Sequence, residues 1–141
     1  MIRAVADTNV IVSAALTQSG PPSLVLELAN DGLIQLYVSP AVFAEYEEVL
    51  GRLRVGVLPL RAQAMLKQLK RMSRIVVPTK KVRVSTDPDD NMLLECAETA
   101  KAHYLITGNT RHFPLRWKYT KVVTPRQFVD LFGSSPQKTR D

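Results

Sequence analysis

Acidic and amide side chains stand at places in the sequence where predicted strands end or a predicted helix begins. Asp7 directly follows the apolar run Ile2–Ala6, Asn109 follows Tyr104–Thr107, and residues 87–91 read Asp-Pro-Asp-Asp-Asn. Clustered carboxylates repel one another, and their pKa values rise unless a cation neutralises them. Oxygen-only ligands suit Mg²⁺ or Mn²⁺, which activate water and stabilise a phosphodiester under attack. These residue types therefore predict phosphoryl chemistry supported by a divalent cation.

Asp7 and Asn109 also have purely structural explanations. Asp7 fits a turn or N-cap aspartate in front of a helix that begins at Asn9, and Asn109 fits a turn residue that tolerates a left-handed backbone. Thr107 fits an ordinary strand edge in the same way. The sequence alone leaves both interpretations open for these residues.

The segment at 87–91 is more informative. Asp87 fits an N-cap, and Asp90 lies three residues on, where a carboxylate can satisfy free amides and the helix dipole. Asp90 also shares the helix face of Leu94 and Ala97, which directs it toward the core. Capping does not explain that direction, because a buried unpaired charge is costly.

Two further acids flank an apolar helical stripe. Ser39-Pro40 predicts an N-cap and a first-turn proline, and the helix that follows has Tyr46 at the centre of its apolar face. Glu45 and Glu47 lie at about 100° to either side of that residue, at ~3.6 residues per turn. A helical wheel does not choose between them, and either fits a carboxylate paired with Lys or Arg.

The elements that must position these residues alternate between strands and helices. This pattern predicts a three-layer α/β/α fold with a central, mostly parallel sheet, in which ligands bind beyond the carboxyl ends of the strands. The predicted strands are 2–6, 34–38, 74–77, 104–107 and 121–123. The predicted helices are 9–16, 23–31 with Ser23 as cap, 40–53, 60–72 with Leu60, Ala64, Leu66 and Leu69 as its apolar positions, 88–100 and 126–132.

Length and composition bound the class of protein. The 141 residues suit one domain, which we place at 1–132, with 133–141 as a flexible polar C-terminal tail. No apolar run reaches the ~18 residues that cross a bilayer, and the N-terminus meets an acid too early for a signal peptide. The single cysteine, Cys96, excludes an internal disulfide and a four-cysteine zinc site and fits buried packing. We therefore expect a cytoplasmic protein without a membrane partner.

The positive charge is concentrated in the middle of the chain. Residues 49–86 contain ten Lys or Arg and no Asp or Glu, within a net charge of +6. Such a segment is either a solvated helical face or a surface for phosphates, which basic side chains bind without sequence preference. The residues that we single out as nucleic-acid contacts are Arg52, Arg54, Lys67, Lys70 and Arg71.

Four segments, in this order, resemble the PIN-domain ribonucleases. They are Asp7-Thr8-Asn9, the stretch 39–45 reading Ser-Pro-Ala-Val-Phe-Ala-Glu, the stretch 87–91, and Thr107-Gly108-Asn109. The resemblance covers about residues 1–130 and is strongest for the VapC-like toxin components of toxin–antitoxin pairs. It implies a Mg²⁺- or Mn²⁺-dependent active site, hydrolysis of single-stranded RNA, a cognate antitoxin and a homodimer or higher homo-oligomer.

The resemblance also assigns roles to residues. Its three acids correspond to Asp7, Glu45 and Asp90, which settles the choice between Glu45 and Glu47. The family's fourth position, which is often aspartate, is occupied here by Asn109. Three residues later, where some members have a further acid, this sequence has His112. Asn9 and Thr107 are candidates for groups that orient the metal ligands or contact phosphate. Asp87 and Asp89 are candidates to substitute for the missing acids.

These observations lead to one main prediction and two alternatives. The main prediction is a metal-dependent endoribonuclease, the toxin component of a toxin–antitoxin system. The first alternative is a catalytically weak or inactive RNA-binding or regulatory module, because Asn109 and His112 replace acids. A phosphotransfer or receiver domain is disfavoured because the first strand ends in Asp7-Thr8-Asn9 rather than in Asp-x-Asp, and because the sequence has no glycine-rich phosphate loop. The apolar stretches Leu24–Leu36 and Val42–Leu53 fit either a dimer or antitoxin surface or the core.

Overall fold

A six-stranded sheet forms the centre of the protein. The computed structural model describes residues 1–54 and 58–133. The strand order is β3-β2-β1-β4-β6-β5, with all neighbours parallel except β5, which pairs antiparallel with β6. The strands are β1 (Ile2–Ala6), β2 (Ile34–Val38), β3 (Ser73–Ile75), β4 (Tyr104–Ile106), β5 (Arg116–Trp117) and β6 (Thr120–Val123).

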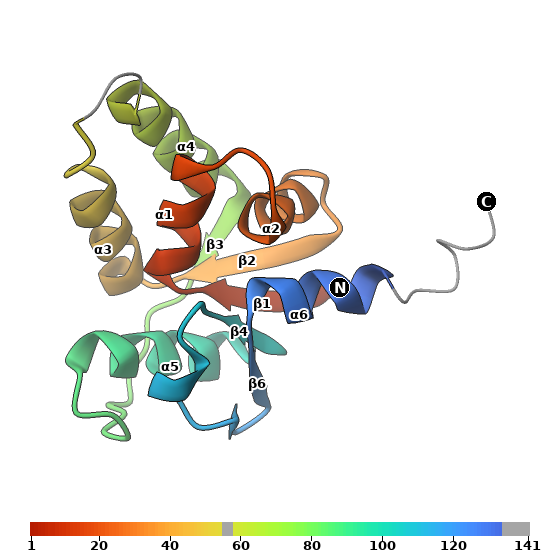
Figure 1. Cartoon of the computed structure of the whole chain (residues 1–141). Helices are drawn as coiled ribbons and strands as arrows, with labels where there is room; N and C mark the ends of the chain where they lie inside the picture. The colour runs from red at the N-terminus through yellow and green to blue at the C-terminus, as the bar shows by residue number, and fades with distance from the viewer. Residues whose placement is uncertain (55–57, 134–141) are drawn as a thin grey trace.

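Helices cover both faces of this sheet, so the predicted three-layer α/β/α fold is confirmed. Figure 1 shows α1, α2 and α4 on one side of the sheet and α5 on the other. The helices are α1 (Thr8–Leu16), α2 (Pro21–Asn30), α3 (Pro40–Leu50), α4 (Leu58–Met72), α5 (Pro88–Ala100) and α6 (Pro125–Gly133), with a short 3₁₀ turn η1 (Thr110–His112).

Several predicted boundaries shift. Helix α2 begins at Pro21 behind Gly20, whose φ of 100° suits glycine, so Ser23 is not the N-cap. The Ser23 hydroxyl instead donates to the carbonyl of Thr17 at 2.7 Å. The strand predicted at 74–77 runs from Ser73 to Ile75. Strand β5 was not predicted because two residues carry no periodic pattern.

The apolar stripe predicted for the fourth helix is wrong in part. The buried residues of α4 are Ala62 and Leu69, whereas Leu60 is 73% exposed and Ala64 is also exposed. Helix α4 packs against α1 and α3, and the small Ala62 side chain suits close approach to them. Contacts with α1 and α3 therefore determine which face of α4 is buried, and Leu60 at the start of the helix remains exposed.

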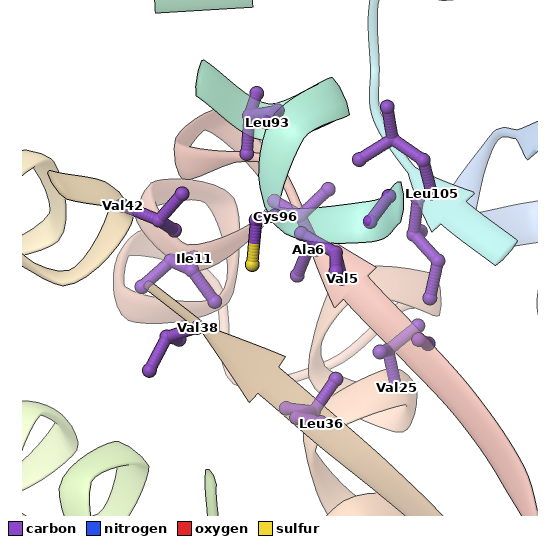
Figure 2. Packing of buried hydrophobic residues seen from close by; sticks show 14 of the residues in the cluster. Val5, Ala6, Ile11, Val25, Leu36, Val38, Val42, Leu93, Cys96 and Leu105 are labelled. Carbon is purple, nitrogen blue, oxygen red and sulfur yellow. The ribbon is translucent and has the colours of Figure 1, made fainter. Parts of the chain in front are cut away.

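The core lies between the sheet and its helices. Figure 2 shows side chains from β1, β2, α1, α3 and α5 meeting around Cys96, which is fully buried as predicted. Burial raises the pKa of the Cys96 thiol to about 12, so it stays protonated. The two stretches left open as core or interface contribute mainly to this core, through residues such as Val25, Leu36 and Val42.

Two expectations concern the ends and the surroundings of the chain. Residues 134–141 of the predicted tail lie outside the described residues, and Gly133 ends α6. Among the helices in 1–54 and 58–133, none combines the length and the apolarity needed to cross a bilayer.

The strand order creates a switch point between β1 and β4. From β1 the chain moves outward to β2 and β3, and it later returns to the other side of β1 as β4. Beyond the strand ends, Asp7 N–H still donates to the Ile106 carbonyl at 2.8 Å, and Thr107 N–H donates to Val123 at 2.9 Å. Both residues are thus fixed at the carboxyl edge of the sheet, where open α/β sheets bind ligands.

Candidate active site

The side chain of Asp7 is held by Thr107, which follows the neighbouring strand β4, and by Asn9 in the first turn of α1. Asp7 occupies the N-cap position of α1, but its side chain makes no capping hydrogen bond. Its Oδ2 accepts from the Thr107 hydroxyl at 2.8 Å and from Asn9 Nδ2 at 3.3 Å. Asp7 thus stands at the N-cap position, as the structural interpretation predicted, and its carboxylate is oriented by Thr107 and Asn9.

The same hydrogen bonds hold the loop after β4. Asn9 Oδ1 accepts from the Gly108 amide at 3.0 Å, and Thr107 Oγ1 accepts from the Asn109 amide at 3.0 Å. Asn109 has φ −122°, so the left-handed turn considered for it is not present. Asn9 and Thr107 thus fix Asp7 and the loop that carries Asn109 as one unit.

Glu45 is placed by the tyrosine next to it. The buried Tyr46 hydroxyl donates to the carbonyl of Ala6 at 2.5 Å, which ties α3 to the end of β1. Ser39 caps the helix as predicted, with its Oγ accepting from the Val42 amide at 3.1 Å. Glu45 consequently faces Asp7, whereas Glu47 lines a separate hollow on the other side of α3.

Asp90 points inward, as its helix face predicted. Asp87 is the N-cap of α5, accepting from the Asp89 amide at 3.0 Å. Asp90 is only 9% exposed, and its Oδ2 accepts from the Ser85 hydroxyl at 3.2 Å. The sequence interpretation that gave Asp90 a share in capping the first turn is replaced by this bond.

Sequence reasoning missed Ser85 and Asn91. Asn91 Oδ1 accepts from the amides of Val84 at 3.1 Å and Ser85 at 2.8 Å, and its Nδ2 donates to the Ser85 carbonyl at 2.8 Å. Asn91 thereby folds the preceding loop so that Ser85 meets Asp90. The position of Asn91 just after the capped start of α5 was a possible signal for this role. The spacing of residues did not reveal that Asn91 binds Ser85.

These residues surround one depression, which we call the acidic depression. It has a volume of about 460 Å³ and includes every acid to which the family resemblance gave a role, whereas Glu47 lies outside it. In residues 1–54 and 58–133, no Lys or Arg lies within ion-pair distance of Asp7, Glu45 or Asp90. The lining residues are Asp7, Thr8, Asn9, Val12, Ser13, Glu45, Val49, Asp87, Asp89, Asp90, Asn109 and His112.

The pKa values of three of these carboxyls are raised. Burial is the largest cause in each case, followed among the raising causes by Asp90 for Asp7, by Asp89 for Glu45 and by Asp87 for Asp90. The Thr107 hydrogen bond opposes the rise at Asp7, and the Ser85 hydrogen bond does so at Asp90. Such a group of carboxylates is disfavoured in its charged form and is stabilised by a cation.

The donor set fits a hard divalent cation in its chemistry. Every candidate ligand offers oxygen, which Mg²⁺ and Mn²⁺ prefer over soft ligands. Among the described residues, no three acids, histidines or cysteines converge closely enough to hold an ion in this conformation. An ion in this depression would therefore need water molecules among its ligands, or a movement that brings the carboxylates closer together.

None of the five candidate RNA contacts lines the acidic depression, although Arg52 is close enough to Glu45 to oppose the rise in its pKa. Arg52 forms an exposed ion pair with Glu48 at 3.0 Å, and Lys70 lines the hollow that contains Glu47. Arg54, Lys67 and Arg71 are also exposed.

The two histidines have different positions. His112 is exposed as expected, yet it lines the acidic depression, and its charge opposes the rise in the pKa of Asp90. His103 lies between α5 and β4, where its Nδ1 accepts from the Arg3 amide at 2.9 Å. It joins the beginnings of β1 and β4, and its own amide donates to the Arg3 carbonyl at 2.8 Å.

Tyr46→Phe is expected to lower the free energy of unfolding by about 1–2 kcal/mol, because the buried Ala6 carbonyl loses a donor. Burial keeps the pKa of Tyr46 well above its usual value, so the hydroxyl donates at all ordinary pH values. Urea unfolding measures the change. Tyr37→Phe is the control, since the Tyr37 hydroxyl donates to no group in the described part of the chain; an equal loss there would contradict the anchoring role.

The comparison with sequence families decides the classification. The family model of the PIN domain matches residues 3–111. The chain belongs to the PIN domain family. PIN domains are generally nucleases, and these nucleases generally use divalent metals. In this PIN domain the match includes Asp7, Glu45, Asp90 and Asn109 and ends one residue before His112.

Individual proteins resemble this PIN domain along most of its length. It is 30% identical over 143 residues to the uncharacterized protein MJ1680 of Methanocaldococcus jannaschii, covering 93% of this chain and 92% of that protein. Its fold is similar to a chain of VapBC2 from Rickettsia felis, solved bound to a DNA fragment from their promoter. The TM-score is 0.61 at 17% identity, covering 86% of this chain and 97% of that one.

Proposed function

We propose that this PIN domain is an endoribonuclease that hydrolyses single-stranded RNA with the help of Mg²⁺ or Mn²⁺. One observation carries the proposal: three carboxylates with raised pKa values line one depression at the carboxyl edge of the sheet, without a basic partner among the described residues. A protein that only coats nucleic acid gains nothing from acids gathered there. A nuclease needs them to hold a cation against the scissile phosphate.

The chain's own residues divide the work. Asp7, Glu45 and Asp90 would hold the ion, and the Asn109 amide would orient a water molecule or offer its carbonyl oxygen. When bound, the cation would stabilise the negative charge on the phosphate and lower the pKa of a nearby water molecule. Asn9 and Thr107 keep Asp7 in place, and Asp87 and Asp89 add negative potential at the rim. In-line attack by water then leaves a 5′-phosphate and a 3′-hydroxyl.

The basic residues would hold the RNA strand outside the acidic depression. Arg52 is near enough to Glu45 to lower its pKa, so it connects the two charged regions. Arg54, Lys67, Lys70 and Arg71 extend the positive surface beyond it and would contact phosphates without sequence preference.

We further propose that the protein is the toxin of a toxin–antitoxin pair, acts in the cytoplasm and forms a homodimer or higher homo-oligomer. The likeness of its fold to a chain of VapBC2 supports this proposal. The test is the neighbouring reading frame: expressed together with this chain, a small DNA-binding protein from that frame should co-purify with it and suppress cleavage. Separate elution of the two proteins with full cleavage would contradict the pairing.

The activity itself is tested with purified protein and a labelled single-stranded RNA. We expect cleavage with Mn²⁺ or Mg²⁺, none with EDTA, and a 5′-phosphate on the downstream product. RNA binding without cleavage under any of these conditions would support the alternative, an inactive RNA-binding module in which Asn109 and His112 replace acids.

Thr107→Val is expected to reduce cleavage by about 10–100-fold, a typical effect of losing a group that orients a metal ligand. The side chain keeps its shape but no longer donates to Asp7 or accepts from the Asn109 amide. Initial rates at saturating Mn²⁺ measure the loss. Thr107→Ser restores the hydroxyl and should recover most of the rate; if serine is as slow as valine, the hydroxyl does not act through Asp7.

A further inference from the structure

A second hollow opens beside the acidic depression. It has a volume of about 380 Å³ and shares Asn9, Ser13 and Asn109 with the depression as lining residues. Its size lies in the range of small-ligand sites, ~300–1,000 Å³. Because the two hollows share lining residues from α1 and the loop after β4, they are neighbours, and an RNA strand lying in one is close to the other.

The lining of this second hollow differs sharply from that of the depression. The depression is lined by five acids, whereas the second hollow is lined by none and contains Arg126. Its remaining wall is largely apolar and rigid, formed by Val10 and three prolines. The prolines are Pro21 and Pro22 at the start of α2 and Pro125 at the start of α6. We call it the proline hollow.

The base and the phosphate of one nucleotide suit the apolar proline wall and the arginine of the proline hollow, respectively. A nucleobase is flat and largely apolar on its faces, which suits rigid proline surfaces, and a phosphate suits a guanidinium. Arg126 is exposed and makes no ion pair within residues 1–54 and 58–133. Gly108 lines the proline hollow with backbone alone, and its amide donates to Asn9 Oδ1, which lines both hollows.

We propose that the proline hollow is a subsite for one RNA nucleotide next to the scissile bond. The base lies against Pro21, Pro22 and Pro125, and Arg126 contacts the phosphate. This inference rests on the proposed ribonuclease function and extends it, because it assigns the direction in which the strand leaves the acidic depression. It also adds a basic contact outside the 49–86 segment that the sequence singled out.

The first test removes the phosphate contact. Binding of a fluorescent single-stranded RNA is measured over a range of salt concentrations with the cleavage-deficient Asp7→Asn protein. Adding Arg126→Gln should weaken binding by about tenfold at low salt. It should also reduce the steepness of log K against log salt by about 0.7, the value for one single-strand phosphate contact.

Arg116→Gln is the matched control, because Arg116 is an exposed arginine on β5 that lines neither hollow. It should leave the affinity and the salt dependence unchanged. Equal effects of the two substitutions would show only a general loss of positive charge and would overturn the proposal. So would an Arg126→Gln protein that binds like its parent.

The second test concerns the base. Wild-type protein is given RNAs in which a single abasic nucleotide replaces each position flanking the cleaved bond. One adjacent position should lower kcat/KM by about fivefold or more, as the loss of a stacked base does. No position-dependent loss would overturn the base contact.

The two proposals fail in different ways. If wild-type protein cleaves RNA normally and Arg126→Gln leaves its KM unchanged, the subsite is wrong and the ribonuclease function stands. If wild-type protein does not cleave any RNA, the function itself is wrong. If the proline hollow instead binds a protein, Arg126→Gln weakens that association and leaves RNA binding unchanged, which also overturns the subsite.

Discussion

Asp7→Asn is expected to reduce RNA cleavage by at least about 100-fold and, at the same time, to make the metal-free protein more stable. The carboxylate oxygen that faces the acidic depression is lost as a cation ligand. Metal ions contribute several kcal/mol to stabilising the charge of such a reaction, and each 1.36 kcal/mol is tenfold in rate. The isosteric amide still accepts from the Thr107 hydroxyl, so the local hydrogen bonding is largely kept.

The gain in stability follows from the direction of the pKa shift. Burial is the largest cause that raises the pKa of Asp7 above its ordinary value, and the nearby Asp90 adds to it. The folded protein therefore binds a proton more tightly than the unfolded chain, and ionisation at neutral pH opposes folding. A neutral asparagine removes that opposition, the usual trade between stability and activity at a functional site.

Asp31→Asn is the matched control for this experiment. Asp31 is exposed and follows α2, before β2 begins, at the opposite edge of the sheet from the acidic depression. Cleavage rate and thermal midpoint are measured for both variants in EDTA and in Mn²⁺. Retained cleavage in Asp7→Asn, or a lower midpoint than wild type without metal, would contradict the role assigned to Asp7.

The second large effect is a coupling of stability to pH and to divalent cations. Without metal, the contribution of Asp7, Glu45 and Asp90 to stability is most favourable below their ordinary pKa values of 3.8 and 4.5. It declines as pH rises through that range toward their raised values in the folded protein, because the folded state then holds protons that the unfolded chain has released. Besides burial, the charge of Asp90 raises the pKa of Asp7, and the charge of Asp7 raises that of Glu45, so ionisation of these carboxyls opposes folding.

A cation should reverse this loss only where the carboxyls are ionised. At pH 7, Mn²⁺ at 100 times its Kd should add about 2.7 kcal/mol to the free energy of unfolding. Near pH 4 the gain should nearly disappear, since protons compete for the same oxygens. Urea unfolding at both pH values, with EDTA or Mn²⁺, measures the effect.

A double variant isolates the site from the other titrating groups of the protein. Asp7→Asn combined with Asp90→Asn should show a flatter dependence on pH between 4 and 7 and no gain from Mn²⁺. If Mn²⁺ stabilises the double variant as much as wild type, the ion binds elsewhere.

The positions of Asp7, Asn109 and Asp90 were predictable because strand ends and helical periodicity can be recognised in short stretches of sequence. Asp7 and Asn109 follow strands that pair as neighbours, so the parallel sheet brings their ends to one edge. Asp90 shares a helix face with Leu94, and both are buried. Periodicity and strand ends are properties of short segments, and a single sequence carries them directly.

Other parts depend on contacts between distant segments. Glu45 and Glu47 are equivalent on a helical wheel, and the orientation of α3 was decided by Tyr46 reaching the end of β1. The loop that brings Ser85 to Asp90 is closed by Asn91. In α4, packing against α1 and α3 buried Ala62 instead of Leu60.

The proline hollow is the largest feature that spacing did not reveal. It joins Pro21 and Pro22 at the start of α2 to Pro125 at the start of α6, more than 100 residues later. Helices α2 and α6 pack against each other, which closes this wall. Proline is common in the first turn of helices because its fixed φ suits that position. The sequence alone therefore did not show that these three prolines form one surface.

The central claim is that Asp7, Glu45 and Asp90 together hold a divalent cation at the switch point of the sheet. The most direct test is a crystal of this protein soaked in Mn²⁺, with the ion located from its anomalous scattering. We expect a peak between the carboxylates of Asp7 and Asp90, within coordination distance of both, and its loss in Asp7→Asn. An ion bound elsewhere, or none at a Mn²⁺ concentration that supports cleavage, would contradict the claim.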